Sequence, residues 1–333
     1  ASSSSTSYPR RNADRCKPAK ATSARPASRA KSPRLSAAAK LSPLGFFMAL
    51  PPVLVVLCFV GIPIFIAFSF SLGFTGGPNE VISIIGQDIY KKTSWWGTLD
   101  AYKAVFNDAR FPGDLWMTLS VTFISTTVVL LMALGMGIYQ RIKGGRIASL
   151  LSTLSLVPLF VPVVISAWAI HTFYDGNGFM KTFFMQFGID FPTLTSTRTA
   201  VILGTIWTSL PFAILMVTSG LQSIPDALIE TAQDAGASFM RILRTIMIPL
   251  AFVPIVIAGT FTAIGIMGSF TVPLFLGPNQ PTMLGVEISN FFGAYNRPQH
   301  SIVMAFVIFA AASGIAVLYI WANVRSAKQS GRI

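Results

Sequence analysis

Six long apolar segments limit what this chain can fold into. Each is long enough to cross about 30 Å of hydrocarbon, which requires about 20 helical residues. All 25 Lys and Arg residues and all 12 Asp and Glu residues lie outside these segments, as expected because a charge inside a membrane is costly. We therefore predict an all-α polytopic membrane protein with six transmembrane helices. The predicted spans are residues 44–72, 117–139, 148–173, 199–219, 247–270 and 301–323.

Composition and charge placement exclude other classes of protein. Hydrophobic residues make up 53% of the chain and charged residues 11%, and the mean hydropathy is +0.63, which excludes an ordinary soluble enzyme. The net charge of +13 is concentrated in residues 1–43, which contain a single acid, Asp14. We interpret this segment as a disordered, basic cytoplasmic tail that contacts membrane lipid, with an organellar transit peptide as the alternative. No nucleic-acid partner is expected.

The basic residues also predict the orientation of the chain. If the N-terminus is inside, the inside segments carry 18 Lys and Arg residues and the outside loops carry 7. Positive charge concentrates on the cytoplasmic side of membrane proteins. Both termini are therefore predicted to be cytoplasmic, with residues 326–333 as a short C-terminal tail. The loops 73–116, 174–198 and 271–300 are predicted to face outward.

The connection between the fourth and fifth spans, residues 220–246, has the pattern of two short helices joined at a glycine. Ser223 is predicted to cap the first helix in a capping box with Asp226. Gly236 is suited to the left-handed conformation that ends a helix, and Ser238 is predicted to cap the second helix. One face of the first helix is expected to hold Leu228, Thr231, Ala232 and Ala235.

This loop resembles the motif of a known family. The membrane subunits of type I binding-protein-dependent ABC importers carry Glu-Ala-Ala, three residues, Gly, nine residues, Ile, one residue and Leu-Pro. The chain has the same spacing and two departures. Thr231 stands in place of the first Ala, and Ile248 stands in place of the Leu. The matching residues are Glu230-Thr231-Ala232, Gly236, Ile246, Ile248 and Pro249.

The resemblance implies a permease fold, its partners and its coupling residues. It covers about residues 44–325, the predicted permease domain, and implies a place in the bacterial cytoplasmic (inner) membrane. In this family the short helix inserts into a groove of a separate ATPase. The implied partners are two ATPase subunits, a second permease that is identical or homologous, and an extracytoplasmic solute-binding protein. The residues implied in coupling are Glu230, Thr231, Ala232, Gln233, Asp234, Gly236 and Arg241.

The chain itself carries no nucleotide-binding motif. Lys143-Gly144-Gly145 lacks the preceding glycine and the strand of a phosphate-binding loop. We therefore predict a transport subunit that is not an enzyme and has no catalytic residue, with ATP and Mg held by the partner ATPase and no cofactor bound by this chain. The two histidines, His171 and His300, form no metal-ligating or catalytic pattern.

The solute is predicted from a weaker resemblance. Residues 233–238 and 268–277 are similar to the branch of the family that transports polyamines, iron and phosphonates, and the spermidine/putrescine pattern implies a polyamine or a related organic solute. Ser269 stands where relatives often carry Asp or Glu, so an anion for a polyamine ammonium is missing there. The candidates for the solute path are Trp168, His171, Trp207, Thr208, Ser209, Thr260, Thr262, Ser269 and Phe270.

Other functions stay open on the sequence alone. Within the family the alternative is a sugar or inorganic-anion permease, and from another class it is a secondary transporter that uses no ATP. Such a transporter should show charged residues within the membrane or internal repeats, and the spans show neither. Residues 97–108 resemble the segment before the second span of many such permeases. With Asp100, Asp108 and Asp114, this region would offer a docking surface to a solute-binding protein.

Overall fold

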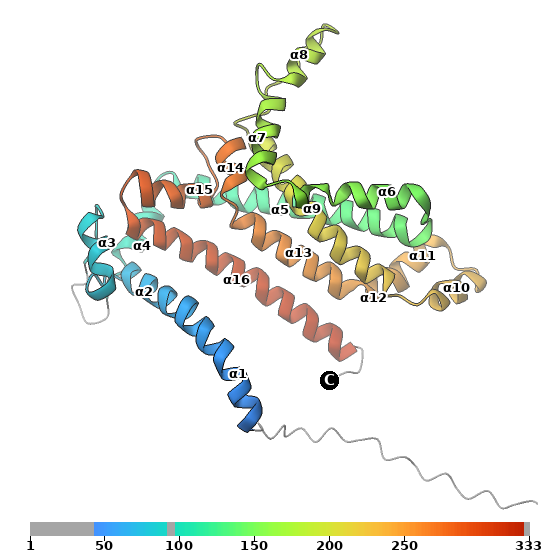
Figure 1. The fold of residues 1–333 in the computed structure, drawn as a ribbon, viewed down its shortest axis with the longest axis horizontal. Coiled ribbons are helices and arrows are strands. Elements are labelled where there is room, and N and C mark those ends of the chain that lie inside the picture. The colour runs from blue at the N-terminus through green and yellow to red at the C-terminus, as the bar shows by residue number, and fades with distance from the viewer. Residues whose placement is uncertain (1–42, 92–96, 330–333) are drawn as a thin grey trace, which may run out of the picture. The chain divides into compact units, whose positions relative to one another are not determined.

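The computed structural model describes residues 43–91 and 97–329, which form helices joined by turns and loops, with no strand among them (Figure 1). Apart from its last residue, the predicted N-terminal tail lies outside the described residues. The chain divides into two compact units, Ala1–Val55 and Val56–Ile333. The first contributes most of α1 (Pro43–Val56), and the other helices belong to the second.

Four helices of the second unit run for several turns and are joined by shorter ones. The long helices are α5 (Phe111–Ile142), α9 (Arg198–Gln222), α13 (Phe252–Met267) and α16 (Pro298–Gln329). The shorter ones are α2 (Ile62–Ser71), α3 (Glu80–Ile85), α4 (Asp100–Asn107), α6 (Gly145–Ser155), α7 (Val163–Tyr174), α8 (Phe179–Met185), α10 (Asp226–Asp234), α11 (Phe239–Ile242), α12 (Ile248–Leu250), α14 (Thr271–Leu276) and α15 (Leu284–Ser289). Wider π-helical turns occupy Leu57–Gly61, Leu243–Met247 and Asn290–Ala294.

The helices agree with six membrane spans, but two of the spans are bent. Four helical stretches of the described residues are long and apolar enough to cross a membrane, and there are up to six if each bent pair is one span. The bent pairs correspond to the predicted spans 148–173 and 247–270, and their bends are 104° and 67°. At the end of the chain, α16 continues to Gln329, so the first residues of the predicted C-terminal tail extend the last helix.

Prolines account for both bends. Val161 precedes Pro162 and is extended, with φ −102° and ψ 120°, because a proline disfavours the helical conformation of the residue before it. In the second bent pair, Pro254 has no N–H to donate to the carbonyl of Leu250. The chain leaves regular helical geometry at Ala251, where φ is −87° and ψ is 6°.

The core lies where α5, α9 and α13 pack against one another, with α16 against α13 (Figure 1). Buried Val129 of α5, Val217 of α9 and Ala258 of α13 belong to one apolar cluster. A Cβ at Gly220 of α9 would lie 2.5 Å from the Cβ of Pro254, so the two helices approach closely only because Gly220 has no side chain. Small residues at helix contacts are typical of membrane bundles.

A buried glutamine ties the start of α16 to two other segments. The Gln299 side chain accepts a hydrogen bond from the Tyr90 backbone N–H (2.8 Å). Its amide donates to the carbonyls of Phe70 (2.9 Å) and Tyr90 (3.2 Å). Beside it, Arg297 pairs with Asp88 at 2.7 Å. These polar contacts fix the segment that follows α3 against the beginning of α16.

Much of the apolar surface of the long helices is not covered by the chain itself. Within the span Arg198–Gln222, 44% of the most apolar stretch is buried by the chain. Within Pro298–Trp321, the corresponding share is 18%. Large side chains such as Phe123 and Phe309 are more than half exposed. A surface of this kind is stable only against lipid or another apolar subunit.

Candidate functional site

The loop that carries the family-like motif folds into the predicted elbow. The N–H of Gly236 donates to the Gln233 carbonyl (2.8 Å) and the N–H of Ala237 to the Ala232 carbonyl (2.9 Å), the two bonds of a Schellman motif. Gly236 has φ of +75°, as the sequence predicts. Ser238 directly precedes α11, but its side chain makes no capping hydrogen bond.

The predicted capping box is wrong. The Ser223 hydroxyl donates to the carbonyl of Gly220 (2.8 Å), and α10 begins only at Asp226. Pro225 takes the capping position with an extended ψ of 135°, which moves the helix start beyond the reach of Ser223. The Asp226 carboxylate accepts a hydrogen bond from Arg141 of α5 instead (2.5 Å).

The face of α10 that packs on the bundle also differs from the prediction. Ile229 and Ala232 pack against the apolar core, whereas Leu228, Thr231 and Ala235 are exposed. Ile229 is the larger apolar side chain that can reach the bundle together with Ala232, since residues three apart share a helix face. The packing of the half-buried Ile229 against the core turns α10 so that Leu228 is exposed.

The residues implied in coupling lie together on the exposed surface of α10 and α11, which we call the elbow surface. Of the described charged residues, Glu230, Asp234 and Arg241 form no ion pair with one another or with others. Phe239 and Met240 add an apolar patch, with 50% and 48% of each residue exposed. Of the predicted set Glu230, Thr231, Ala232, Gln233, Asp234, Gly236 and Arg241, all are exposed except the half-buried Ala232.

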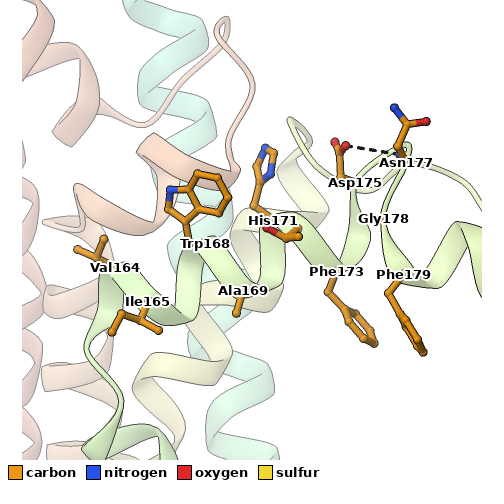
Figure 2. Close-up of a pocket in the computed structure, with 11 residues that line it drawn as sticks. Val164, Ile165, Trp168, Ala169, His171, Phe173, Asp175, Asn177, Gly178 and Phe179 are labelled. Carbon is orange, nitrogen blue, oxygen red and sulfur yellow. Dashed lines mark hydrogen bonds between the residues drawn. The ribbon is translucent and has the colours of Figure 1, made fainter.

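Two of the predicted path residues line a pocket of about 870 Å³ along α7 and the turn after it. Figure 2 shows Trp168 and His171 on the same side of α7 as Asp175, and the two ring centroids are 6.2 Å apart. The Asp175 carboxylate accepts a hydrogen bond from the Thr195 hydroxyl (3.1 Å) and pairs with no described Lys or Arg. Aromatic rings beside a carboxylate that forms no ion pair with a described residue suit an organic cation.

Trp207 of α9 is not among the residues that line the first pocket. It lines a second pocket, of about 600 Å³, together with Ile165 and Phe173 of α7. Both α7 residues also line the first pocket, so the two pockets are neighbours. The hydroxyl of Thr208, the next residue of α9, donates to the Gly204 carbonyl of its own helix (3.1 Å).

The remaining path candidates do not share these pockets. Thr260 and Thr262 are buried among the packed helices, at 8% and 4% exposure. Ser209 and Ser269 are half-buried, and Phe270 is exposed. The structure therefore brings Trp168, His171 and Trp207 to one region around α7 and leaves the hydroxyl residues elsewhere.

Asp175 is not among the residues predicted for the solute path, because those candidates are polar and aromatic residues inside the apolar segments and Asp175 lies just after the third one. The signal is present in the sequence, since Asp175-Gly-Asn-Gly178 is a turn directly after an aromatic-rich span. Arg141 is one of the 18 basic residues that predict the orientation of the chain, and the sequence alone indicates no contact for it. No group of three or more metal-ligating side chains occurs in the part of the chain that the structure describes.

Two of the acids predicted to form an outer docking surface lie at the surface beside basic residues. Hydrogen bonds from Thr98 and Lys103 hold the pKa of Asp100 below its ordinary value. Partial burial raises the pKa of Asp108, but hydrogen bonds from the backbone and guanidinium of Arg110 outweigh it, so the pKa is lowered. Both carboxylates are therefore ionised at neutral pH.

The third acid, Asp114, is not available for docking. It is 2% exposed, and its carboxylate accepts a hydrogen bond from the Thr282 backbone N–H (2.8 Å). One turn along α5, the Thr118 hydroxyl accepts one from the Leu284 N–H (2.9 Å). Asp114 lies in the first turn of α5, and this turn holds the loop before α15, which covers the carboxylate.

Comparison with known proteins identifies the family. Residues 129–329 match the model of the binding-protein-dependent transport system inner membrane component. The chain belongs to this family. It is therefore a multi-pass permease subunit of an ABC importer, and its place is the inner membrane. The matched residues include both pockets beside α7 and the whole elbow surface.

Several permeases with different solutes are similar to this one. It is 28% identical over 265 residues to the spermidine/putrescine transport system permease protein PotB of Haemophilus influenzae, across 75% of this chain and 92% of that protein. It is 25% identical over 287 residues to the trehalose/maltose permease MalF of Thermococcus litoralis, across 83% and 92%. A crystal structure of a bacterial ABC transporter involved in import of alginate has the same fold, with a TM-score of 0.64 at 20% identity over 86% and 95% of the two chains.

Proposed function

We propose that the permease forms the solute path of an ATP-driven importer. The elbow surface binds the ATPase subunit and transmits its conformational change to the membrane helices. The observation that carries this is α10, a helix of nine residues with no buried residue. An amphipathic helix held by a few contacts at one face has room for a partner on the other faces. The charged groups of the elbow surface that form no ion pair with a described residue, together with its exposed apolar patch on α11, favour a protein groove over lipid headgroups.

The partners follow from this role. Two ATPase subunits bind ATP and Mg and dock on the cytoplasmic side, which holds the loop 220–246 and both termini. A second permease, identical or homologous, supplies the other half of the path and covers apolar surface that this chain leaves open. An extracytoplasmic solute-binding protein delivers the solute on the side of α4, where Asp100 and Asp108 stay ionised.

Crosslinking tests the elbow surface as the ATPase dock. In a chain with Cys16 and Cys58 replaced by Ser, we expect Glu230→Cys carrying a thiol-linked photocrosslinker to form an adduct with the ATPase subunit in membranes. Asp100→Cys, an exposed acid on α4, is the matched control and should form none. The adduct is detected by immunoblot for both subunits. Labelling of Glu230→Cys by an impermeant thiol reagent from outside intact cells would contradict the proposed topology.

We further propose that the solute is an organic cation of the polyamine class. The similarity to a spermidine/putrescine permease supports this, as do the Trp168 ring and the Asp175 carboxylate that face one pocket. A sugar is the second candidate, because the same pocket has Phe173 and Phe179 stacked 5.2 Å apart and a trehalose/maltose permease is also similar. Aromatic faces bind sugar rings, whereas the carboxylate favours a cation.

Uptake by Asp175→Asn separates the two solutes. If the solute is a polyamine, we expect uptake of radiolabelled spermidine to fall about tenfold, because the variant loses the negative charge that attracts the ammonium groups. Trehalose uptake should not depend on this charge. Asp190→Asn is the control, since Asp190 is exposed and pairs with Lys181 (3.6 Å). Wild-type accumulation of trehalose and not spermidine would refute the polyamine assignment.

A further inference from the structure

Arg141, in the last turn of α5, holds three groups of a neighbouring chain segment. Its Nε donates to the Leu221 carbonyl (3.2 Å), and its Nη2 donates to the Ile224 carbonyl (2.8 Å) and the Asp226 carboxylate (2.5 Å). The Arg141 side chain is 15% exposed. One guanidinium therefore joins the end of α5 to the end of α9, to the linker and to the start of α10.

Arg141 binds polar groups at two helix ends, where hydrogen-bond partners within the helix are missing. Leu221 lies in the last turn of α9, where carbonyls have no partner within the helix and the helix dipole favours a cation. Asp226 is the first residue of α10, where the dipole favours an anion. The Arg141 cation therefore lies at the C-terminal end of α9, and the Asp226 anion lies at the N-terminal end of α10. Each charge is favourable for its helix dipole, and the two groups also bind each other.

The two carbonyl contacts contribute more to this arrangement than the ion pair. The Asp226 side chain is 74% exposed, so water screens its attraction to Arg141. Leu221 and Ile224 are 0% and 4% exposed and belong to the apolar core. The hydrogen bonds to their carbonyls are less exposed to water than the ion pair, and the rigid fork of the guanidinium gives them a fixed direction.

We propose that Arg141 is the positioning residue that passes a movement of α10 to α5 and α9. This rests on the proposed function, in which the ATPase docks on the elbow surface. With the Arg141 contacts in place, the start of α10 and the ends of both spanning helices move together. Without them, residues 223–225, which form a turn and not a helix, absorb the displacement before it reaches the spans.

Arg141→Lys isolates geometry from charge. A lysine keeps the positive charge at this end of α5, and hence the signal for orientation. Its single ammonium cannot reproduce the planar fork that reaches two carbonyls and a carboxylate. Lys143→Ala is the matched control, because Lys143 is exposed two residues away and makes no ion pair with a described residue.

The experiment measures solute transported per ATP hydrolysed by the whole complex in proteoliposomes. The probe is radiolabelled spermidine or trehalose, whichever the wild-type complex accumulates. For Arg141→Lys we expect ATP hydrolysis near the wild-type rate and a fall of about fivefold or more in solute per ATP. Lys143→Ala should keep the wild-type ratio. A residue that only stabilises the fold would lower both activities in proportion and leave the ratio unchanged.

A wild-type ratio in Arg141→Lys overturns the proposal. If the variant assembles less complex, solute uptake and ATP hydrolysis fall together, so their ratio still tests the role of Arg141. The Glu230→Cys crosslink to the ATPase separates this failure from failure of the proposed function. Crosslinking with an unchanged ratio refutes only the role of Arg141. Absence of the Glu230→Cys crosslink in the chain that keeps Arg141 refutes the docking of the elbow surface itself.

Discussion

Gly236→Val is expected to reduce solute uptake about tenfold or more while the amount of permease in the membrane stays near the wild-type level. A residue with a Cβ at a φ of +75° is strained by about 1–2 kcal/mol. No other atom lies within 4 Å of the Cβ position, so the strain comes from the backbone and not from collision. This energy is too small to unfold the chain, but it favours other loop conformations in which α10 is no longer aimed at its partner.

Gly236→Asn is the matched control for this prediction, since asparagine tolerates the left-handed conformation better than other residues with a side chain. It should retain much of the uptake that the valine variant loses. The measurements are the membrane level by immunoblot, solute uptake, and the amount of ATPase that co-purifies. Wild-type uptake and co-purification in Gly236→Val would show that the elbow does not couple the two subunits.

Gln299→Leu should lower the free energy of unfolding by about 3 kcal/mol, the largest loss of stability that we predict. Leucine is similar in size, but it leaves the Tyr90 N–H and carbonyl without the partner that Gln299 supplies. The Phe70 carbonyl loses one hydrogen bond and keeps the one from the Gly73 N–H. Each buried polar group that loses its hydrogen bond costs about 1–3 kcal/mol. Thermal unfolding of the detergent-solubilised chain measures the effect as a lower Tm.

Gln87→Leu is the control for this change, because Gln87 is an exposed glutamine near the same segment. Its Tm should stay close to that of the wild type. Equal Tm values for Gln299→Leu and the wild type would mean that water or rearranged backbone satisfies these groups. The segment after α3 would then not be fixed by the start of α16.

The spans and the glycine of the elbow could be predicted from the sequence because each depends on local chemistry. An apolar run without charge has few stable places other than a membrane, and Gly236 is required where the backbone becomes left-handed. The bends were missed although Pro162 and Pro254 are visible in the sequence. A proline signals a lost hydrogen bond, but its neighbours decide whether the helix bends or ends.

At the candidate site, the sequence leaves open which way a side chain faces. Thr260 and Thr262 look like path residues because they are hydroxyls in an apolar helix, yet they lie among packed helices. Leu228 and Ile229 are adjacent apolar residues, and only the contact with the bundle decides which of them packs against the core. Asp114 shows the same limit, because the loop that covers it comes from a distant part of the chain. No pattern within one segment contains this information.

The wide turn between the elbow and the fifth span also restricts how such a chain can change during evolution. In a regular α-helix, residues five apart point about 140° away from each other. Ile242 and Met247 are five apart, yet both are buried in the same apolar cluster, because the turn closed by the Ile248 N–H and the Leu243 carbonyl holds one extra residue. Loss or gain of a single residue there would rotate the elbow relative to the span. Length differences among related chains are therefore expected in the outer loops rather than in this turn.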